Sequence, residues 1–161
     1  MGLPTTKGTY ILIIFLDKNK SIVIGKLGKI YFSQGLYAYV GSAYGSGGIR
    51  ARVWRHIRKY NKHKFWHIDY LLEHADIERV IIIENKKIEC YLAQAMLKYG
   101  FEYVPNFGSS DCKCESHLFI VEDIDSLKNI LKSKKIKYSE IIISNRFYGH
   151  RIIRTDPLQV C

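Results

Sequence analysis

Residues 8–16 read GTYILIIFL, a run of β-branched, aromatic and other apolar side chains that the turn-forming sequence DKNK ends. This composition favours an extended, buried segment, and the polar residues after it are typical of a turn. We therefore predict the first strand of a sheet at residues 8–16 and work outward from it.

A second strand is predicted at residues 35–41, GLYAYVG. Its side chains alternate between two faces, as the period of a strand requires: Leu36, Ala38 and Val40 lie on one, and Tyr37, Tyr39 and Gly41 on the other. Between the two strands, the short runs SIVIG and KIYFS flank residues 26–28 and predict an inserted hairpin.

The rest of the chain alternates helical and extended patterns. Helices are predicted at residues 49–60, 66–74, 87–99 and 124–134, strands at 78–83 and 117–122, and a loop at 101–116. YSEIIIS at 138–144 and GHRIIRT at 149–155 predict a terminal hairpin. The fold class is then α+β, with a small antiparallel or mixed sheet flanked by helices. We divide it into a domain at residues 7–121 and an extension at 122–161, which would serve as a cap or as a dimerisation or specificity arm.

The charge of the chain points to a polyanionic partner. Its 161 residues carry a net charge of +10, with an isoelectric point near 9.4, which favours nucleic acid. A proteome biased toward Lys and Ile would give the same excess. The apolar runs are too short to span a bilayer, and the first residues do not resemble a secretion signal. With four unevenly spaced cysteines as well, we expect a cytoplasmic protein with reduced thiols or a partial metal site.

Four residues suggest phosphate chemistry. Arg52 precedes His56 by one helical turn, and both lie immediately beside the apolar stripe of the helix at 49–60, which Ile49, Val53 and Ile57 form. We expect both to project at the boundary between core and solvent, where a fixed guanidinium stabilises charge on a phosphate. Tyr10 and Tyr39 would join them if their strands pair. For Arg52 alone, an arginine that covers apolar surface on a basic helix is the simpler interpretation.

The order of these residues resembles the GIY-YIG nuclease superfamily. Gly8-Thr9-Tyr10 stands for its first motif and Tyr39-Val40-Gly41 for its second, followed by Ser42-Ala43 and then Arg52. The segments YAYVGSA, FWHIDYLL, IECYLAQA and FGSSDCKCESHLF resemble, more narrowly, a mostly uncharacterised prokaryotic branch once listed as a domain of unknown function. The superfamily usually joins its two motifs by one short turn, so the hairpin between them is a departure.

The resemblance implies a phosphodiesterase that uses one divalent metal ion, Mg²⁺ or Mn²⁺. Glu89 would hold the metal, and Tyr10, Tyr39, Arg52 and His56 would be catalytic. Either Tyr39 or His56 would handle the proton of the attacking water. The superfamily's late asparagine has Asn106 as its nearest match, with Ser109 or Ser110 as replacements, and His117 is a further candidate that would hydrogen-bond across the site.

A second cluster lies in SSDCKCESH at residues 109–117. Cys112, Cys114 and His117 offer three ligands for Zn²⁺, and Cys90 or Asp111 would be the fourth. Because Cys-x-Cys is not the usual zinc-knuckle spacing, small buried thiols are the alternative.

A basic surface with aromatic residues follows the arginine helix, and its predicted nucleic-acid contacts are Arg50, Arg55, Arg58, Lys59, Lys62 and Lys64. The main hypothesis is an endonuclease that acts on DNA, more than on RNA, with structured or repair-related DNA as the substrate. The alternatives are a non-catalytic nucleic-acid-binding module and a zinc or thiol protein centred on Cys112 and Cys114.

Overall fold

The computed structural model describes residues 2–59, 62–147 and 150–154. Within them a five-stranded sheet has the order β6-β4-β1-β5-β7, and every neighbouring pair of strands is antiparallel. The first predicted strand is its central member, and the predicted α+β class is confirmed. The strands are β1 (Gly8–Leu16), β4 (Gly35–Ala43), β5 (Asp76–Glu84), β6 (Leu118–Val121) and β7 (Ser139–Ile142).

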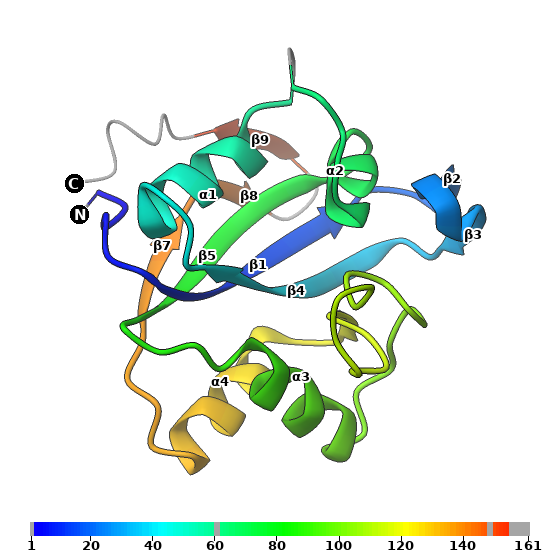
Figure 1. Ribbon diagram of the computed structural model, residues 1–161. Helices are drawn as coiled ribbons and strands as arrows, with labels where there is room; N and C mark the ends of the chain where they lie inside the picture. The colour runs from blue at the N-terminus through cyan, green and yellow to red at the C-terminus, as the bar shows by residue number, and fades with distance from the viewer. Residues whose placement is uncertain (1, 60–61, 148–149, 155–161) are drawn as a thin grey trace.

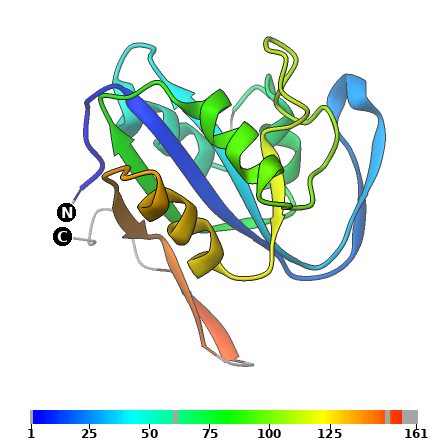
Figure 2. The same cartoon turned by 90° about the horizontal axis from the view of Figure 1, so that it is seen from below.

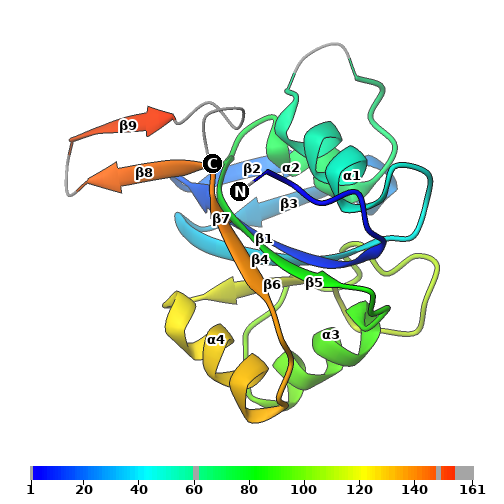
Figure 3. The same cartoon turned by 90° about the vertical axis from the view of Figure 1, so that its left-hand side faces the viewer.

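Helices cover both faces of this sheet, so the molecule has three layers (Figure 1). On one face lie α1 (Gly48–Ile57) and α2 (His67–Leu72), and on the other lie α3 (Glu89–Lys98) and α4 (Ile124–Ser133). Figure 3 shows the same separation from the side. The predicted helices are therefore present, each with ends within a few residues of the expected positions.

The strand alternation divides the core into two apolar clusters. Tyr37 and Tyr39 of β4 pack on the α1 and α2 side, whereas Ala38 and Val40 pack on the α3 and α4 side. This confirms the two faces predicted for residues 35–41. β1 divides in the same way and is buried along almost its whole length, as a strand covered by helices on both faces must be.

The inserted hairpin forms as predicted. Its strands are β2 (Lys20–Val23) and β3 (Lys29–Phe32), and they are joined through a short 3-10 turn at Gly25–Leu27. Ile22, Ile24 and Phe32 are buried and belong to the core cluster on the α1 and α2 side. The insertion therefore enlarges one core layer and leaves the register between β1 and β4 undisturbed.

The predicted terminal hairpin is wrong in its pairing. Residues 139–142 form β7, which pairs with β5 and extends the main sheet, because the edge of β5 offers unpaired backbone groups and Ile141 is buried there. The hairpin forms one segment later, between β8 (Ser144–Phe147) and β9 (His150–Arg154), and projects from the sheet (Figure 2). The ends of its predicted second strand, residues 149 and 155, lie outside the described residues. The segment after residue 121 thus contributes α4 and β7 to the common layers.

One close contact fixes how β1 meets β4. Tyr10 lies directly opposite Gly41 in the register, and the Tyr10 ring covers this glycine so tightly that an added Cβ would lie 2.7 Å from Cε2 and closer still to Cζ and Oη. Heavy atoms do not approach so closely, so only glycine fits beneath the ring.

We therefore expect Gly41→Ala to lower the free energy of unfolding by roughly 2 kcal/mol or more, because the added methyl group overpacks a buried contact. Gly2→Ala is the matched control, since nothing lies within 4 Å of its added Cβ. Urea unfolding of both variants measures the effect. Equal midpoints for Gly41→Ala and Gly2→Ala would contradict the packing of Tyr10 on Gly41.

Candidate active site

Tyr10, Tyr39 and His56 come together on the α1 side of the sheet. β1 supplies Tyr10, β4 supplies Tyr39, and α1 supplies His56. The Tyr10 hydroxyl lies 2.7 Å from Nε2 of His56, and the ring centroids of Tyr39 and His56 are 6.2 Å apart in an edge-to-face arrangement. The two predicted tyrosines and the predicted histidine therefore form one buried group.

His56 is buried, so its expected place at the boundary with solvent is wrong. Only 2% of its surface is exposed, because the rings of Tyr10, Tyr39 and Trp66 surround it. Burial lowers the pKa of His56 to about 3, so the imidazole is neutral at pH 7. Its Nδ1 atom is buried and has no hydrogen-bond partner within the described part of the chain.

Burial also determines the protonation state of the two tyrosines. It raises the pKa of both Tyr10 and Tyr39 well above the ordinary value, and the positive charge of Arg52 only partly opposes the shift. Both phenols are therefore protonated at neutral pH. In this state each hydroxyl can donate or accept a hydrogen bond, and the neutral imidazole of His56 has one ring nitrogen with a free lone pair.

Arg52 lies beside this group on the surface of α1. Its guanidinium stacks 4.3 Å from the centroid of Trp66, and the guanidinium of Arg55 stacks at 4.4 Å. Stacking on an aromatic ring holds a guanidinium in place and leaves its N–H groups for an anion. Within the described residues, Arg52 makes no ion pair with an acidic side chain.

Arg55 has a different role, which Asp69 of α2 determines. The two side chains form a bidentate pair with distances of 2.7 and 2.9 Å, and Asp69 also accepts hydrogen bonds from the backbone N–H groups of Phe65 and Trp66. Although burial opposes ionisation, these bonds lower the pKa of Asp69 to about 2. The pair joins α1 to α2 and fixes the start of α2 beside Trp66.

A glycine-rich connection at residues 44–47 leads into α1, and the N-terminal segment packs against the first turn of this helix. The backbone N–H of Ile49 donates to the carbonyl of Thr6, and that of Arg50 donates to the carbonyl of Pro4. These are two of the amides that the start of a helix would offer to a phosphate. The connection therefore positions α1 and is not a phosphate-binding loop.

The predicted nucleic-acid contacts divide into two groups. Lys59 pairs with Asp76, Lys64 pairs with Glu73, and Lys62 lies 3.8 Å from the carboxylate of Asp69. Arg58 is exposed and forms no ion pair with the described acidic side chains. Arg50 is also exposed, although its Nε donates to the carbonyl of Leu3. The cations free to meet a phosphate are therefore fewer than the sequence suggests.

Glu89 opens α3 on the opposite face of the sheet. Thr9 links this start to β1, because its hydroxyl donates to the carbonyl of Lys86 and accepts from the N–H of Ile88. Within the described residues, no hydrogen bond or ion pair joins Glu89 to the tyrosines, Arg52 or His56. Its Oε2 atom is nevertheless buried without a partner there. A buried carboxylate oxygen with no donor fits a cation ligand, so the residue fits the expected metal.

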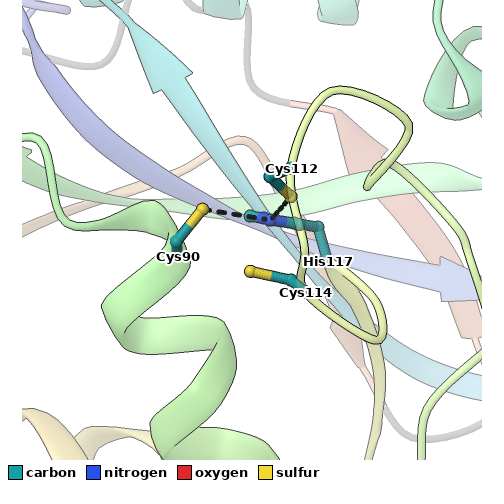
Figure 4. Close-up of side chains that lie close together, drawn as sticks. All are labelled: Cys90, Cys112, Cys114 and His117. Atoms are coloured by element: carbon teal, nitrogen blue, oxygen red, sulfur yellow. Dashed lines mark hydrogen bonds between the residues drawn. The ribbon is translucent and has the colours of Figure 1, made fainter.

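The loop before β6 holds the remaining candidates. Asn106 is exposed, and Ser109 is buried with its carbonyl accepting the N–H of Cys112. His117 hydrogen-bonds through Nδ1 to the carbonyl of Val40 at 3.0 Å. Around its other nitrogen gather Cys90, Cys112 and Cys114 (Figure 4). Cys90 and Asp111 were the two candidates for the fourth ligand, and the structure places Cys90 in the cluster.

The structure thus defines an α+β domain with an aromatic and arginine site on one face and a Cys/His cluster at the edge of the sheet. A family model described as a domain of unknown function, DUF123, matches residues 9–139, so the chain belongs to this family. No curated protein and no solved structure matches the chain. None of the described helices is both long and apolar enough to cross a membrane.

Sequence reasoning missed Asp69. A single Asp inside the helical pattern HIDYLL looks like an ordinary polar residue. The available signal was its place in the first turn of a helix, where a carboxylate accepts free backbone N–H groups. Its partner Arg55 lies fourteen residues earlier, beyond the reach of local patterns.

The buried His56 should make stability depend on pH. Because its pKa in the folded chain is about 3 and the ordinary value is 6.5, its contribution is complete above pH 6.5 and is lost as the pH falls toward 3. Between pH 7 and pH 5 the loss is on the order of 2 kcal/mol. His56→Phe should flatten this part of the profile, whereas His63→Asn, at an exposed residue, should leave it unchanged. Denaturant unfolding at several pH values measures the difference, and an unchanged slope in His56→Phe would contradict it.

Breaking the ion pair between Asp69 and Arg55 should lower the free energy of unfolding. Asp69→Asn removes the negative charge that Arg55 needs and places an amide donor among donors. We expect a loss of about 3 to 5 kcal/mol in the free energy of unfolding. Asp17→Asn, at an exposed aspartate, is the matched control. A calorimetric comparison that finds both variants equally stable would show that the pair does not hold α1 and α2 together.

Proposed function

We propose that the chain is a cytoplasmic, divalent-metal-dependent endonuclease that hydrolyses phosphodiester bonds in DNA, with structured or damaged DNA as the substrate class. One observation carries the proposal: the hydrogen bond between Tyr10 and His56 lies at the centre of a group that also includes Tyr39 and the stacked Arg52. The resemblance to the GIY-YIG superfamily rests on the same residues, in the same order along the chain.

The roles follow from the protonation states. Arg52 neutralises charge on a bound phosphate, because its guanidinium is held by Trp66 and has no competing carboxylate among the described residues. Tyr39 donates a hydrogen bond to a phosphate oxygen or to the attacking water. In the tautomer whose Nε2–H donates to the Tyr10 hydroxyl oxygen, Nδ1 of His56 keeps the lone pair and is the atom left to accept a hydrogen bond from the water or receive its proton.

Glu89 would hold the metal ion through its buried, unpartnered oxygen. Bound there, Mg²⁺ or Mn²⁺ would supply a Lewis acid that polarises the phosphate and stabilises the leaving oxygen. One protein carboxylate is enough for such an ion, which keeps most of its water ligands.

Charge and exposed aromatic surface favour a nucleic-acid substrate. The net charge is +10, and Arg58 is exposed at the end of α1. Phe65 follows in the connection to α2, with 73% of its surface exposed next to Trp66. An exposed ring beside cations suits stacking on an unpaired base, which favours nicked, branched or single-stranded DNA over an intact duplex.

The test is cleavage of end-labelled branched, nicked and single-stranded DNA with and without Mg²⁺ or Mn²⁺. We expect metal-dependent cleavage that falls 100-fold or more in Tyr39→Phe, Arg52→Lys and Glu89→Gln, the usual cost of removing one transition-state contact. Tyr31→Phe and Glu102→Gln alter exposed residues of the same types and should keep full activity.

Two results would overturn the proposal. Cleavage that survives in Glu89→Gln and Arg52→Lys would show that another site, or a contaminant, is responsible. Tight DNA binding with no cleavage in either metal would instead support the non-catalytic binding module.

A further inference from the structure

Three thiols and one imidazole from separate parts of the chain converge at the edge of the sheet. Cys90 is the second residue of α3, and Cys112, Cys114 and His117 belong to the loop before β6. One donor atom from each residue lies within 4.8 Å of all the others. Figure 4 shows the four side chains pointing toward one another.

The spacing of the donor atoms fits a tetrahedral ion. Nε2 of His117 lies 3.4 Å from Sγ of Cys112 and 3.8 Å from Sγ of Cys90. With zinc bonds of about 2.3 Å to sulfur and about 2.0 Å to nitrogen, a tetrahedron places its nitrogen and sulfur ligands roughly 3.6 Å apart. These two nitrogen–sulfur pairs are therefore already near the separation that one bound zinc ion would impose.

A hydrogen bond on the far side of His117 prepares its ring for a metal. Nδ1 lies 3.0 Å from the carbonyl oxygen of Val40, and a carbonyl can only accept. Nδ1 therefore carries the hydrogen and donates it, so that in the neutral ring Nε2 keeps its lone pair and faces the thiols. Metal-binding histidines are generally oriented by such a bond, and it is independent of where the thiols lie.

We propose that Cys90, Cys112, Cys114 and His117 bind one Zn²⁺ in a closed structural site. Three soft thiolate ligands and one imidazole select zinc over Mg²⁺ or Mn²⁺, and four protein ligands leave no position open for a substrate. On binding, three thiol protons are released for one Zn²⁺ taken up. The site is distinct from the metal that Glu89 would hold and does not rest on the nuclease proposal.

The zinc ion would hold a long loop against the aromatic site. Between α3 and β6 the chain has no helix and only one isolated β-bridge, from Tyr103 to Phe119, and a loop of this length without secondary structure is uncommon in a compact domain. The same loop covers Tyr39, since a Cβ added at Gly108 would lie 3.0 Å from the Tyr39 ring and 3.3 Å from Cβ of His117. A metal that ties the loop to Cys90 therefore also fixes the cover over Tyr39.

Metal analysis of the purified full chain tests the site. We expect one zinc per chain by elemental mass spectrometry after purification under reducing conditions without a chelator. The double variant Cys112→Ser, Cys114→Ser should lose it. Cys161→Ser, at the one cysteine outside the described residues, should retain it. Replacement of zinc by Co²⁺ should give the intense visible absorption of a tetrahedral thiolate site.

The Co²⁺ spectrum of the unmutated chain keeps the proposal testable if the double variant does not fold. Chelation should lower the unfolding temperature of the unmutated chain, and added zinc should restore it. The proposal is overturned if the chain neither holds zinc nor gives the thiolate spectrum with Co²⁺, or if the double variant keeps its zinc. A disulfide among Cys90, Cys112 and Cys114 after reducing purification would also overturn it. DNA cleavage is not a readout here, so the two proposals fail separately.

Discussion

The absent side chain at Gly41 is the constraint on which the candidate active site depends. Because the Tyr10 ring packs directly against this glycine, it reaches across β4 and meets His56 from the α1 layer. The register then puts Tyr39 opposite Leu12, two residues back along β4 on the same face. A slip of one residue would send Tyr39 to the opposite face. The glycine thus fixes which side chains share the site before any chemistry is considered.

Much of this arrangement could be predicted because it follows from local periodicity. The alternation in GLYAYVG predicts the two faces of β4, and the four-residue spacing of Ile49, Val53 and Ile57 predicts the apolar stripe of α1, of which Ile49 and Val53 are buried and Ile57 is partly buried. His56 shows the limit of such reasoning. Helical spacing places it beside the stripe, but its burial depends on three aromatic rings that arrive from other elements. Its lowered pKa is a tertiary effect that the sequence of the helix does not contain.

Contacts between distant segments account for the features that the sequence did not predict. β7 took the open edge of β5 because β5 still had unpaired backbone groups, a competition that the hairpin pattern at residues 138–155 could not reveal. Arg55 forms an ion pair with Asp69, so a cation expected to contact phosphate instead joins two helices. The role of Glu89 is still a prediction, since the described contacts show a buried, unpartnered oxygen and do not connect it to the tyrosines.

His117 links the two proposed sites through neighbouring residues of β4. The pairing of β6 with β4 ends at Tyr39 and Leu118, so the backbone groups of Val40 need other partners. His117 supplies both, because its carbonyl accepts the Val40 N–H and its ring donates to the Val40 carbonyl. Its own N–H is held by Phe107. The ring nitrogen left over faces the thiols, so completing the edge of the strand also orients the proposed zinc ligand. A loop displaced from Cys90 of α3 would pull His117 away from Val40, one residue from Tyr39, and so disturb the wall of the aromatic site.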